Sequence, residues 1–243
     1  MNLQLETREL AYPGLLKRGQ SNYRVKILQE WLIINEYYLE PDGKFGPVTQ
    51  GALQAATSYK QLTREAWKIL TENMAQFVSI KPSDSSLAIV ALNKALEAYE
   101  LGVHEIPPNS GPWVRLFMKG EEGADMPWCA GYVSYCLHLA NQCIKNPVEN
   151  LIYSFSCDDF GEWAEKEGRL IKQPAPTIKI GDLFLVHRKD KDYTHMGFVF
   201  SDFNGIVQTV EGNTSLSGSR EGTHVLRRMR GKSNLHFISM DNL

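Results

Sequence analysis

Apolar residues in the first third of the chain recur at helical spacing. One helical stripe is formed by Val25, Leu28, Trp31 and Leu32. Pro47 opens a second helix directly after a turn-rich segment at residues 41–47. Thr63 is placed to cap a third helix, because its hydroxyl can accept the unpaired N–H groups of a first turn. The pattern therefore predicts a small N-terminal three-helix domain over residues 1–78.

A short polar stretch at residues 79–86 separates this segment from a chain of different texture. Helical periodicity predicts further helices at 87–101, 112–118 and 128–140. Alternating apolar and polar residues then predict strands at 180–187, 195–201, 206–210 and 225–229, with a last strand or docked tail at 234–243. Helices followed by strands with short turns are typical of an α+β domain with an antiparallel sheet. We therefore expect a linker at 79–86 and one α+β domain over 87–243.

Composition excludes several classes of partner. The 243 residues have a net charge of −2, with 43% hydrophobic and 22% charged residues, as in ordinary globular proteins. Nucleic-acid binding needs a basic excess, so no nucleic acid is expected as a partner. One basic group, predicted to be a solvated strand face, consists of Arg227, Arg228, Arg230 and Lys232.

Hydropathy along the chain bears on its location. No run of about 18 apolar residues occurs, so we expect no membrane insertion. The first ten residues lack the charged and apolar regions of a Sec signal peptide. We therefore expect a protein that is made in the cytoplasm. We also expect it to be a monomer.

Four cysteines are candidate nucleophiles, and no pair has the C-x-x-C spacing of a zinc ribbon or a thioredoxin motif. A chain of this length does not need disulfides, so free thiols and a reducing cytoplasm are expected. Cys129 opens a predicted helix, where the unpaired N–H groups of the first turn favour a thiolate. Cys136 and Cys143 are expected to be small buried hydrophobes. Cys157 lies in a loop-like stretch with no evident partner.

A nucleophilic cysteine needs a base, and six histidines are available. His195 is the best placed, since it opens a strand and Gly197, on the same face, leaves room for a close neighbour. His187 ends the preceding strand and is the main rival. His138 lies on the helix of Cys129 but is expected to point to the opposite side.

The base in turn needs a group that orients its second nitrogen. If the strand that begins at Ile206 stays extended, it projects Glu211 and Asn213 to one face. Either side chain can then hold the imidazole. Alternatively, Glu211 is a surface charge and Asn213 a turn residue, and spacing alone does not choose.

Four segments resemble the motifs of one enzyme family. They are Met-Pro-Trp-Cys-Ala-Gly-Tyr-Val-Ser-Tyr-Cys-Leu at 126–137, Gly-Asp-Leu-Phe at 181–184, His-Met-Gly-Phe-Val at 195–199 and Glu-Gly-Asn-Thr-Ser at 211–215. In this order they resemble CHAP domains, the cysteine, histidine-dependent amidohydrolases/peptidases. The resemblance implies a papain-like α+β fold and hydrolysis of amide bonds in peptidoglycan. It also implies that Cys129 is the nucleophile, His195 the base, and Glu211 or Asn213 the orienting group.

The N-terminal segment resembles the three-helix peptidoglycan-binding domain. The distinctive part is the turn Asp42-Gly43-Lys44-Phe45-Gly46 before a helix. Its glycines are expected to build the turn, and Asp42 and Phe45 are candidate contacts to glycan. Trp128, beside the nucleophile, is a third candidate contact to substrate. The second turn of the pattern is shortened at residues 62–67, which concerns the strength of wall binding more than the fold.

Together these features predict a peptidoglycan hydrolase that cuts an amide bond of the stem peptide, as an endopeptidase or an N-acetylmuramoyl-L-alanine amidase. No cofactor is expected. No metal is expected either, because residues 120–125 lack the alternating carboxylates of a calcium site. Without a Sec signal, the enzyme is expected to reach the wall after lysis, as an endolysin, or by non-Sec delivery, as an effector. The alternatives are a non-catalytic wall-binding protein and a cysteine amidase acting on a small cytoplasmic amide.

Overall fold

The computed structural model describes residues 8–215 and 222–243. These residues form two compact units. The first unit holds the described residues up to Ser79 together with His104–Ala124, and the second holds Ile80–Val103 and Asp125–Leu243. The predicted absence of a signal peptide concerns the first ten residues, of which residues 1–7 lie outside the described part.

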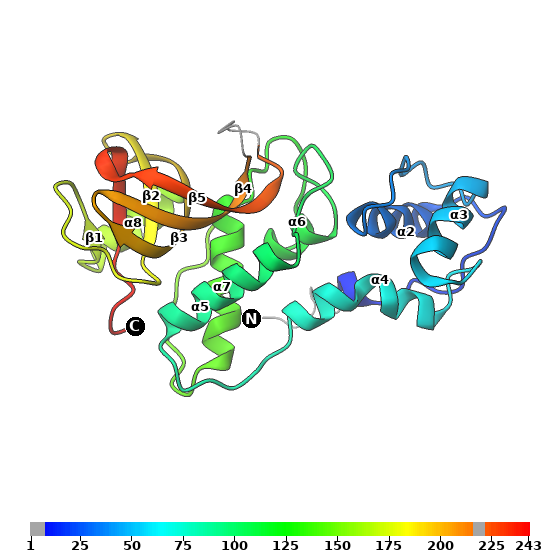
Figure 1. The fold of residues 1–243 in the computed structure, drawn as a ribbon, viewed down its shortest axis with the longest axis horizontal. Coiled ribbons are helices and arrows are strands. Elements are labelled where there is room, and N and C mark those ends of the chain that lie inside the picture. The colour runs from blue at the N-terminus through cyan, green and yellow to red at the C-terminus, as the bar shows by residue number, and fades with distance from the viewer. Residues whose placement is uncertain (1–7, 216–221) are drawn as a thin grey trace. The chain divides into compact units, whose positions relative to one another are not determined.

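The first unit contains the three helices that the sequence predicts. They are α2 (Tyr23–Ile34), α3 (Pro47–Thr57) and α4 (Arg64–Phe77), and Figure 1 labels each of them. The side chain of Thr63 accepts a hydrogen bond from Ala66 N, so the predicted cap of α4 is present. The rings of Trp31 and Trp67 pack edge to face with centroids 5.7 Å apart and join α2 to α4.

The segment 104–124 belongs to the first unit, although the sequence pattern assigned it to the C-terminal domain. It carries the short helix α6 (Pro112–Phe117). The ring of Phe77 on α4 contacts Trp113 and Phe117 of α6, with centroids 5.6 and 6.2 Å away. The sequence pattern did not indicate this grouping, because apolar periodicity shows that a helix has a buried face, but not which element covers that face.

The second unit is an α+β structure with an antiparallel sheet, as predicted. Its helices are α5 (Leu87–Glu100), α7 (Cys129–Cys143) and α8 (Cys157–Lys166). Its strands are β1 (Leu170–Ile171), β2 (Leu183–Lys189), β3 (Asp192–Phe203), β4 (Ile206–Thr214), β5 (His224–Gly231) and β6 (Leu235–Ile238), with a 3₁₀ turn η1 (Lys232–Asn234) before β6. Within the described residues the sheet order is β1-β6-β2-β3-β4-β5, and all neighbours are antiparallel.

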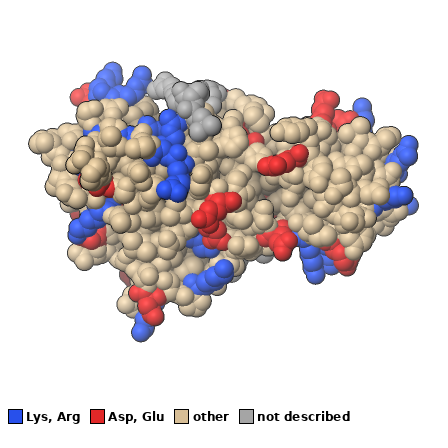
Figure 2. Space-filling view, in the orientation of Figure 1, with Lys and Arg blue, Asp and Glu red and all other residues tan. Residues whose placement is uncertain are grey.

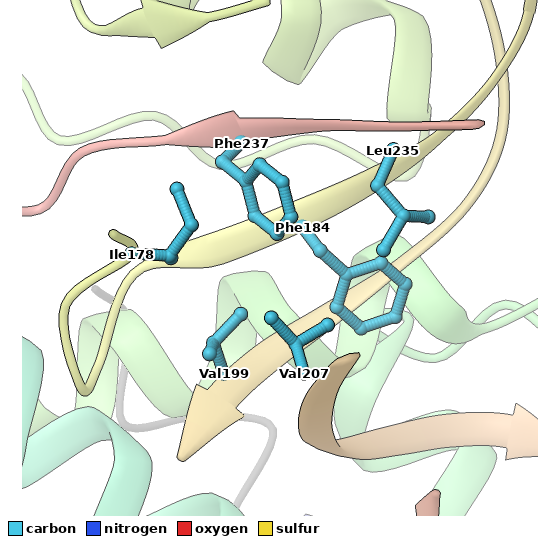
Figure 3. Close-up of a cluster of buried hydrophobic side chains, with 6 residues drawn as sticks. All are labelled: Ile178, Phe184, Val199, Val207, Leu235 and Phe237. Carbon is cyan, nitrogen blue, oxygen red and sulfur yellow. The ribbon is translucent and has the colours of Figure 1, made fainter. Parts of the chain in front are cut away.

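Both faces of the sheet are covered by apolar side chains. On one face of β3, the ring of Phe198 lies edge-on to Tyr132 of α7, at 6.4 Å between centroids. The next residue, Val199, belongs to a buried cluster, which Figure 3 shows as Ile178, Phe184, Val199, Val207, Leu235 and Phe237. Alternation along the strand sends these two neighbours to opposite faces. Helix α7 packs on β3 and β4 and lies beside α5, as Figure 1 also shows, and the Tyr132 hydroxyl donates a 2.9 Å hydrogen bond to Ala95 O of α5.

Helix α8 was expected to begin as a loop. Its first turn is capped by the hydroxyl of Ser156, which accepts from the N–H groups of Asp158 and Asp159 at 3.2 and 3.4 Å. Phe160 and Ala164 are its buried apolar side chains. A serine followed by acidic residues and apolar residues at i, i+4 is a helix-start signal, so this helix could have been predicted.

The surface carries charges of both signs. On the face drawn in Figure 2, acidic and basic side chains are interspersed among uncharged residues. Among the described residues, no helix is long and apolar enough to cross a membrane.

Candidate active site

Cys129 is the first residue of α7, as the sequence predicts. The first backbone bond of this helix joins Tyr132 N to Trp128 O at 2.9 Å. The three preceding N–H groups therefore have no intrahelical acceptor, and that of Ala130 reaches the Cys129 sulfur. No acidic residue lies in the first turn of α7. This end of the helix thus favours a negative charge on the sulfur.

His195 on β3 joins the thiol to a buried carboxylate. The imidazole is hydrogen-bonded to Cys129, and its Nε2 lies 3.0 Å from Glu211 Oε2 on β4. The side chain of His195 is 17% exposed, whereas that of Glu211 is fully buried. An ionised carboxylate can only accept a hydrogen bond, so Nε2 carries the proton and Nδ1 is left for the sulfur. The three residues therefore form one chain of contacts.

Glu211 is held ionised by two further donors. Arg230 of β5 donates from Nε to Oε1 and from Nη2 to Oε2, both at 2.6 Å. The hydroxyl of Thr209 donates to Oε1. Burial alone would raise the pKa of Glu211, but Arg230 and His195 lower it to about 2. The carboxylate is thus charged at neutral pH and fixed in orientation.

Arg230 is the member of this network that sequence reasoning missed. It belongs to the basic group that was expected to be a solvated strand face. Lys232 of that group also has a partner, at 2.8 Å from Asp202 Oδ2, and the guanidinium of Arg227 lies 4.4 Å from the centroid of the Phe200 ring. The prediction was wrong for Arg230 because β4 places an acceptor against it, which composition does not reveal.

Gly197 allows β3 and β4 to approach closely beside the imidazole, in keeping with the space predicted there. A Cβ atom at this position would lie 2.6 Å from Val210 O, 2.9 Å from Cε1 of Phe184 and 3.2 Å from Cγ of Glu211. The first two distances are shorter than ordinary contacts of a Cβ atom. Val210 O belongs to the backbone of β4, so it cannot turn aside as the end of a side chain can. Glycine at this position therefore permits the close approach of β3 and β4 beside Glu211 and His195.

Cys129 and His195 form a charge-separated pair. Hydrogen bonds from Cys157 and from His195 hold the pKa of Cys129 well below its ordinary value, although burial opposes them. Burial would lower the pKa of His195, but the hydrogen bonds and charges of Cys129 and Glu211 raise it to about 9. Both shifts favour a thiolate beside an imidazolium.

Asn213 differs from Glu211 in its environment. Its backbone is left-handed, with φ of 53°, and the pairing of β4 with β5 shifts between Glu211 and Thr214. The extended alternation that would place both side chains on one face is thereby interrupted. Asn213 is buried, and its Oδ1 has no hydrogen-bond partner within the described part of the chain. Glu211 is thus the group observed on the imidazole.

Other cysteines and histidines that were considered as candidates lie in different environments. The sulfurs of Cys157 and Cys129 lie 3.7 Å apart, a contact that the sequence did not predict. Cys136 is buried, and burial raises the pKa of its thiol. The Nε2 atom of His138 lies 3.0 Å from Ile152 O, in keeping with its predicted place away from Cys129. The rival base His187 lies with Nε2 2.9 Å from Asp190 O.

The three candidate substrate contacts lie in different settings. Trp128 is 1% exposed and packs edge-on to Tyr132, so its burial argues against direct contact with substrate. Phe45 is 2% exposed and lies in the core of the first unit. Asp42 is exposed and accepts hydrogen bonds of 2.8 Å from Gln29 Nε2 and from Lys44 N.

Asp42 also borders a hollow of about 260 Å³ in the first unit. The residues around it include Tyr23, whose side chain is largely exposed, and Lys26. An aromatic ring and groups able to donate and accept hydrogen bonds are suited to a sugar or a short peptide. Of the three candidates, Asp42 is the one that is exposed and lies beside a hollow.

All four cysteines are free thiols. Among the described residues, no three His, Cys, Asp or Glu side chains gather in a way that could hold a metal ion.

Comparisons with known proteins assign no family. The chain matches no protein-family model, no curated protein and no solved structure.

Proposed function

We propose that this chain is a cysteine hydrolase that cleaves an amide bond in the stem peptide of bacterial peptidoglycan. The observation that carries the proposal is the chain of contacts from Cys129 through His195 to Glu211, with the thiol at a helix start. Nucleophile, base and orienting group within hydrogen-bond reach are the signature of covalent catalysis. The substrate class is supported by the resemblance of four segments to CHAP domains and of the N-terminal helices to a peptidoglycan-binding domain.

In the first half of the proposed reaction, the thiolate of Cys129 attacks the carbonyl carbon of the scissile amide. The carbonyl oxygen becomes an oxyanion, and we assign the backbone N–H of Cys129, at the start of α7, as one donor to it. One such donor typically lowers the barrier by about 2.7–4 kcal/mol. His195 then gives its Nδ1 proton to the leaving nitrogen, the C–N bond breaks, and a thioester remains on Cys129.

In the second half, neutral His195 takes a proton from water, and the resulting hydroxide attacks the thioester. The acid product leaves and the thiolate is restored, so the enzyme returns to its starting state. Glu211 keeps its charge throughout and stabilises the imidazolium whenever it forms. Its bidentate bond to Arg230 fixes its position.

The test is digestion of purified peptidoglycan from one Gram-negative and one Gram-positive bacterium. Wild type is expected to release new amino groups without new reducing ends, because an amide and not a glycosidic bond is cut. Mass spectrometry of the products identifies the bond. Cys129→Ala and His195→Ala are expected to lose all measurable release, while Cys143→Ala, at the far end of the same helix, keeps it.

Three outcomes contradict the proposal. Full digestion by Cys129→Ala would falsify the nucleophile assignment. If peptidoglycan pulls down wild type but no amine is released, the protein binds the wall without catalysis. Hydrolysis of small amides such as acyl-glutamine peptides, with intact peptidoglycan untouched, would indicate the small-molecule amidase instead.

A further inference from the structure

Two thiols, each at the start of a helix, face one another in the second unit. Cys129 is the first residue of α7 and Cys157 the first residue of α8. Their sulfurs are 3.7 Å apart, and the two residues are only 5% and 7% exposed. A thiol can donate a weak hydrogen bond and a thiolate can accept one. The pair can therefore share one proton between the two sulfurs.

The surroundings decide which sulfur keeps that proton. The first turn of α7 has no acidic residue, whereas that of α8 carries Asp158 and Asp159. His195 contacts Cys129. The hydrogen bond to Cys129, burial and the charge of Asp158 together raise the pKa of Cys157 well above its ordinary value. The proton thus lies on Cys157 and the negative charge on Cys129.

Cys157 is held in place from two sides. The hydroxyl of Ser134 on α7 donates to Ser154 O at 2.7 Å and accepts from Ser154 N at 3.0 Å. Asp158 Oδ1 accepts from Tyr193 N of β3 at 2.6 Å. The start of α8 is therefore fastened both to the helix of Cys129 and to the strand of His195. A donor fixed in this way needs no reorganisation when the thiolate forms.

We infer that Cys157 is a positioning residue for the nucleophile, whose S–H donates a hydrogen bond to the thiolate of Cys129. This inference rests on the proposed function in that it takes Cys129 to be the reacting thiol. No bond is made or broken at Cys157, which keeps its proton throughout. The titratable and charged groups around Cys129 are then Cys157 and Asp158 from α8 and His195 from β3, with Glu211 of β4 and Arg230 of β5 behind the imidazole.

The inference predicts a pH-dependent effect on the reactivity of Cys129. Without the donor, less thiolate is present at low pH. Once the thiolate is fully formed, its reactivity should be equal or slightly greater, because a hydrogen-bonded thiolate is the weaker nucleophile. A merely structural role for Cys157 would instead change the rate by the same factor at every pH.

The experiment is alkylation of the full-length protein by iodoacetamide over a range of pH, with a non-thiol reductant present. The modified Cys129 peptide is quantified by mass spectrometry. Cys157→Ala and Cys157→Ser form a matched pair, since they differ by one hydroxyl donor. Cys157→Val is a second variant without a donor and fills more of the space. Cys143→Ala is the control for loss of a buried thiol.

In Cys157→Ala and Cys157→Val, we expect the midpoint of the rate profile to rise by about one pH unit, as loss of one hydrogen bond to a charged group implies. Below the wild-type midpoint the rate should fall about tenfold. Cys157→Ser should lie between wild type and Cys157→Ala, and Cys143→Ala should coincide with wild type. The midpoint, unlike the plateau, does not depend on how easily the reagent enters.

Cys157→Ala and Cys157→Val are the variants without a donor. The inference is overturned if either of them folds and is alkylated with the same midpoint as wild type. This result is independent of the proposed function, because alkylation needs no peptidoglycan. Shifted midpoints in a protein that leaves peptidoglycan intact refute the function and keep the interaction. Unshifted midpoints in a protein that digests peptidoglycan refute the interaction and keep the function.

Discussion

Each unit of this protein buries glutamate against arginine, with opposite results. In the first unit, Arg115 lies 2.9 Å from carboxylate oxygens of Glu9, Glu30 and Glu122. In the second unit, Glu211 alone accepts from Arg230, His195 and Thr209. One cluster has three acids around one arginine, and the other has one acid for three donors.

The two clusters shift the pKa of a buried glutamate in opposite directions. Burial raises the pKa of Glu30 above its ordinary value, because Arg115 is shared with other carboxylates and one of them, Glu122, adds to the rise. Burial acts in the same direction on Glu211, yet Arg230 and His195 lower its pKa to about 2. Burial does not by itself decide the direction of the pKa shift, because Arg230 and His195 outweigh it at Glu211 whereas Arg115 does not at Glu30.

The largest expected effect breaks the site of the second unit. Glu211→Ala should lower amide release from peptidoglycan by about 10²–10⁴-fold, because the base loses the group that fixes its tautomer and stabilises its charge. Binding to peptidoglycan should be kept. Glu162→Ala, an exposed change on α8, is the control, and normal activity of Glu211→Ala would contradict the role given to this carboxylate.

The next effect is on the stability of the first unit. Arg115→Met leaves buried carboxylates without their cation and should reduce the free energy of unfolding by about 3–5 kcal/mol. Hydrogen exchange of the α2 amides measures this in the first unit. Lys26→Met removes a cation 3.8 Å from Glu30, and because Lys26 is half-exposed it should cost at most about 0.5 kcal/mol. Equal costs for the two changes would mean that Arg115 does not organise the cluster.

A third prediction concerns the alkaline limb of activity. Wild-type kcat/KM should fall as pH rises through about 9, where His195 loses its proton. Glu211→Gln removes one of the two charges that raise the pKa of His195, so this limb should move down by about one pH unit. A pH profile of the residual activity of Glu211→Gln measures the shift. An unmoved limb would show that another group sets it.

The smallest effect is expected at Glu30. Its raised pKa means that the folded state holds the proton more tightly than the unfolded state. The stability it contributes is therefore fully present below its unfolded pKa of about 4.5 and is lost as pH rises through the folded pKa. Glu30→Gln should remove this loss and so raise the free energy of unfolding at neutral pH by about 1 kcal/mol or less.

Glu211 should show the opposite dependence on pH. Its folded pKa of about 2 lies below its unfolded value of 4.5, so its contribution is present above the unfolded value and is lost as pH falls towards 2. Unfolding measured from pH 2 to neutral pH separates the two glutamates, because the contribution of Glu211 is lost below 4.5 and that of Glu30 is lost above it. The comparison fails if stability in the two units changes with pH in the same direction.

Local pattern predicted most of the elements and part of the site. Helix periodicity and the cap at Thr63 located α4, and the helix start located Cys129. Strand alternation favoured His195 as the base and indicated the space at Gly197. These features depend on residues close together in sequence, where the helix and strand periods act directly.

The missing features depend on contacts between distant segments. Whether Glu211 or Asn213 reaches His195 is decided by the shift in pairing within β4 and β5. That Arg230 is a partner of Glu211 and not a solvated charge follows from the pairing of the same two strands. Register is fixed by packing over the whole sheet, so no single strand reveals it.

Sequence patterns alone predicted a thiol at a helix start, a histidine on a strand and helices before an antiparallel sheet. The tertiary structure alone decided that Cys157 meets Cys129, that Glu211 holds the imidazole and that residues 104–124 pack with the first unit. The physical reason is the range of the interactions. Periodicity records which face of an element is buried, whereas the partner on that face is chosen by packing among elements far apart in the chain.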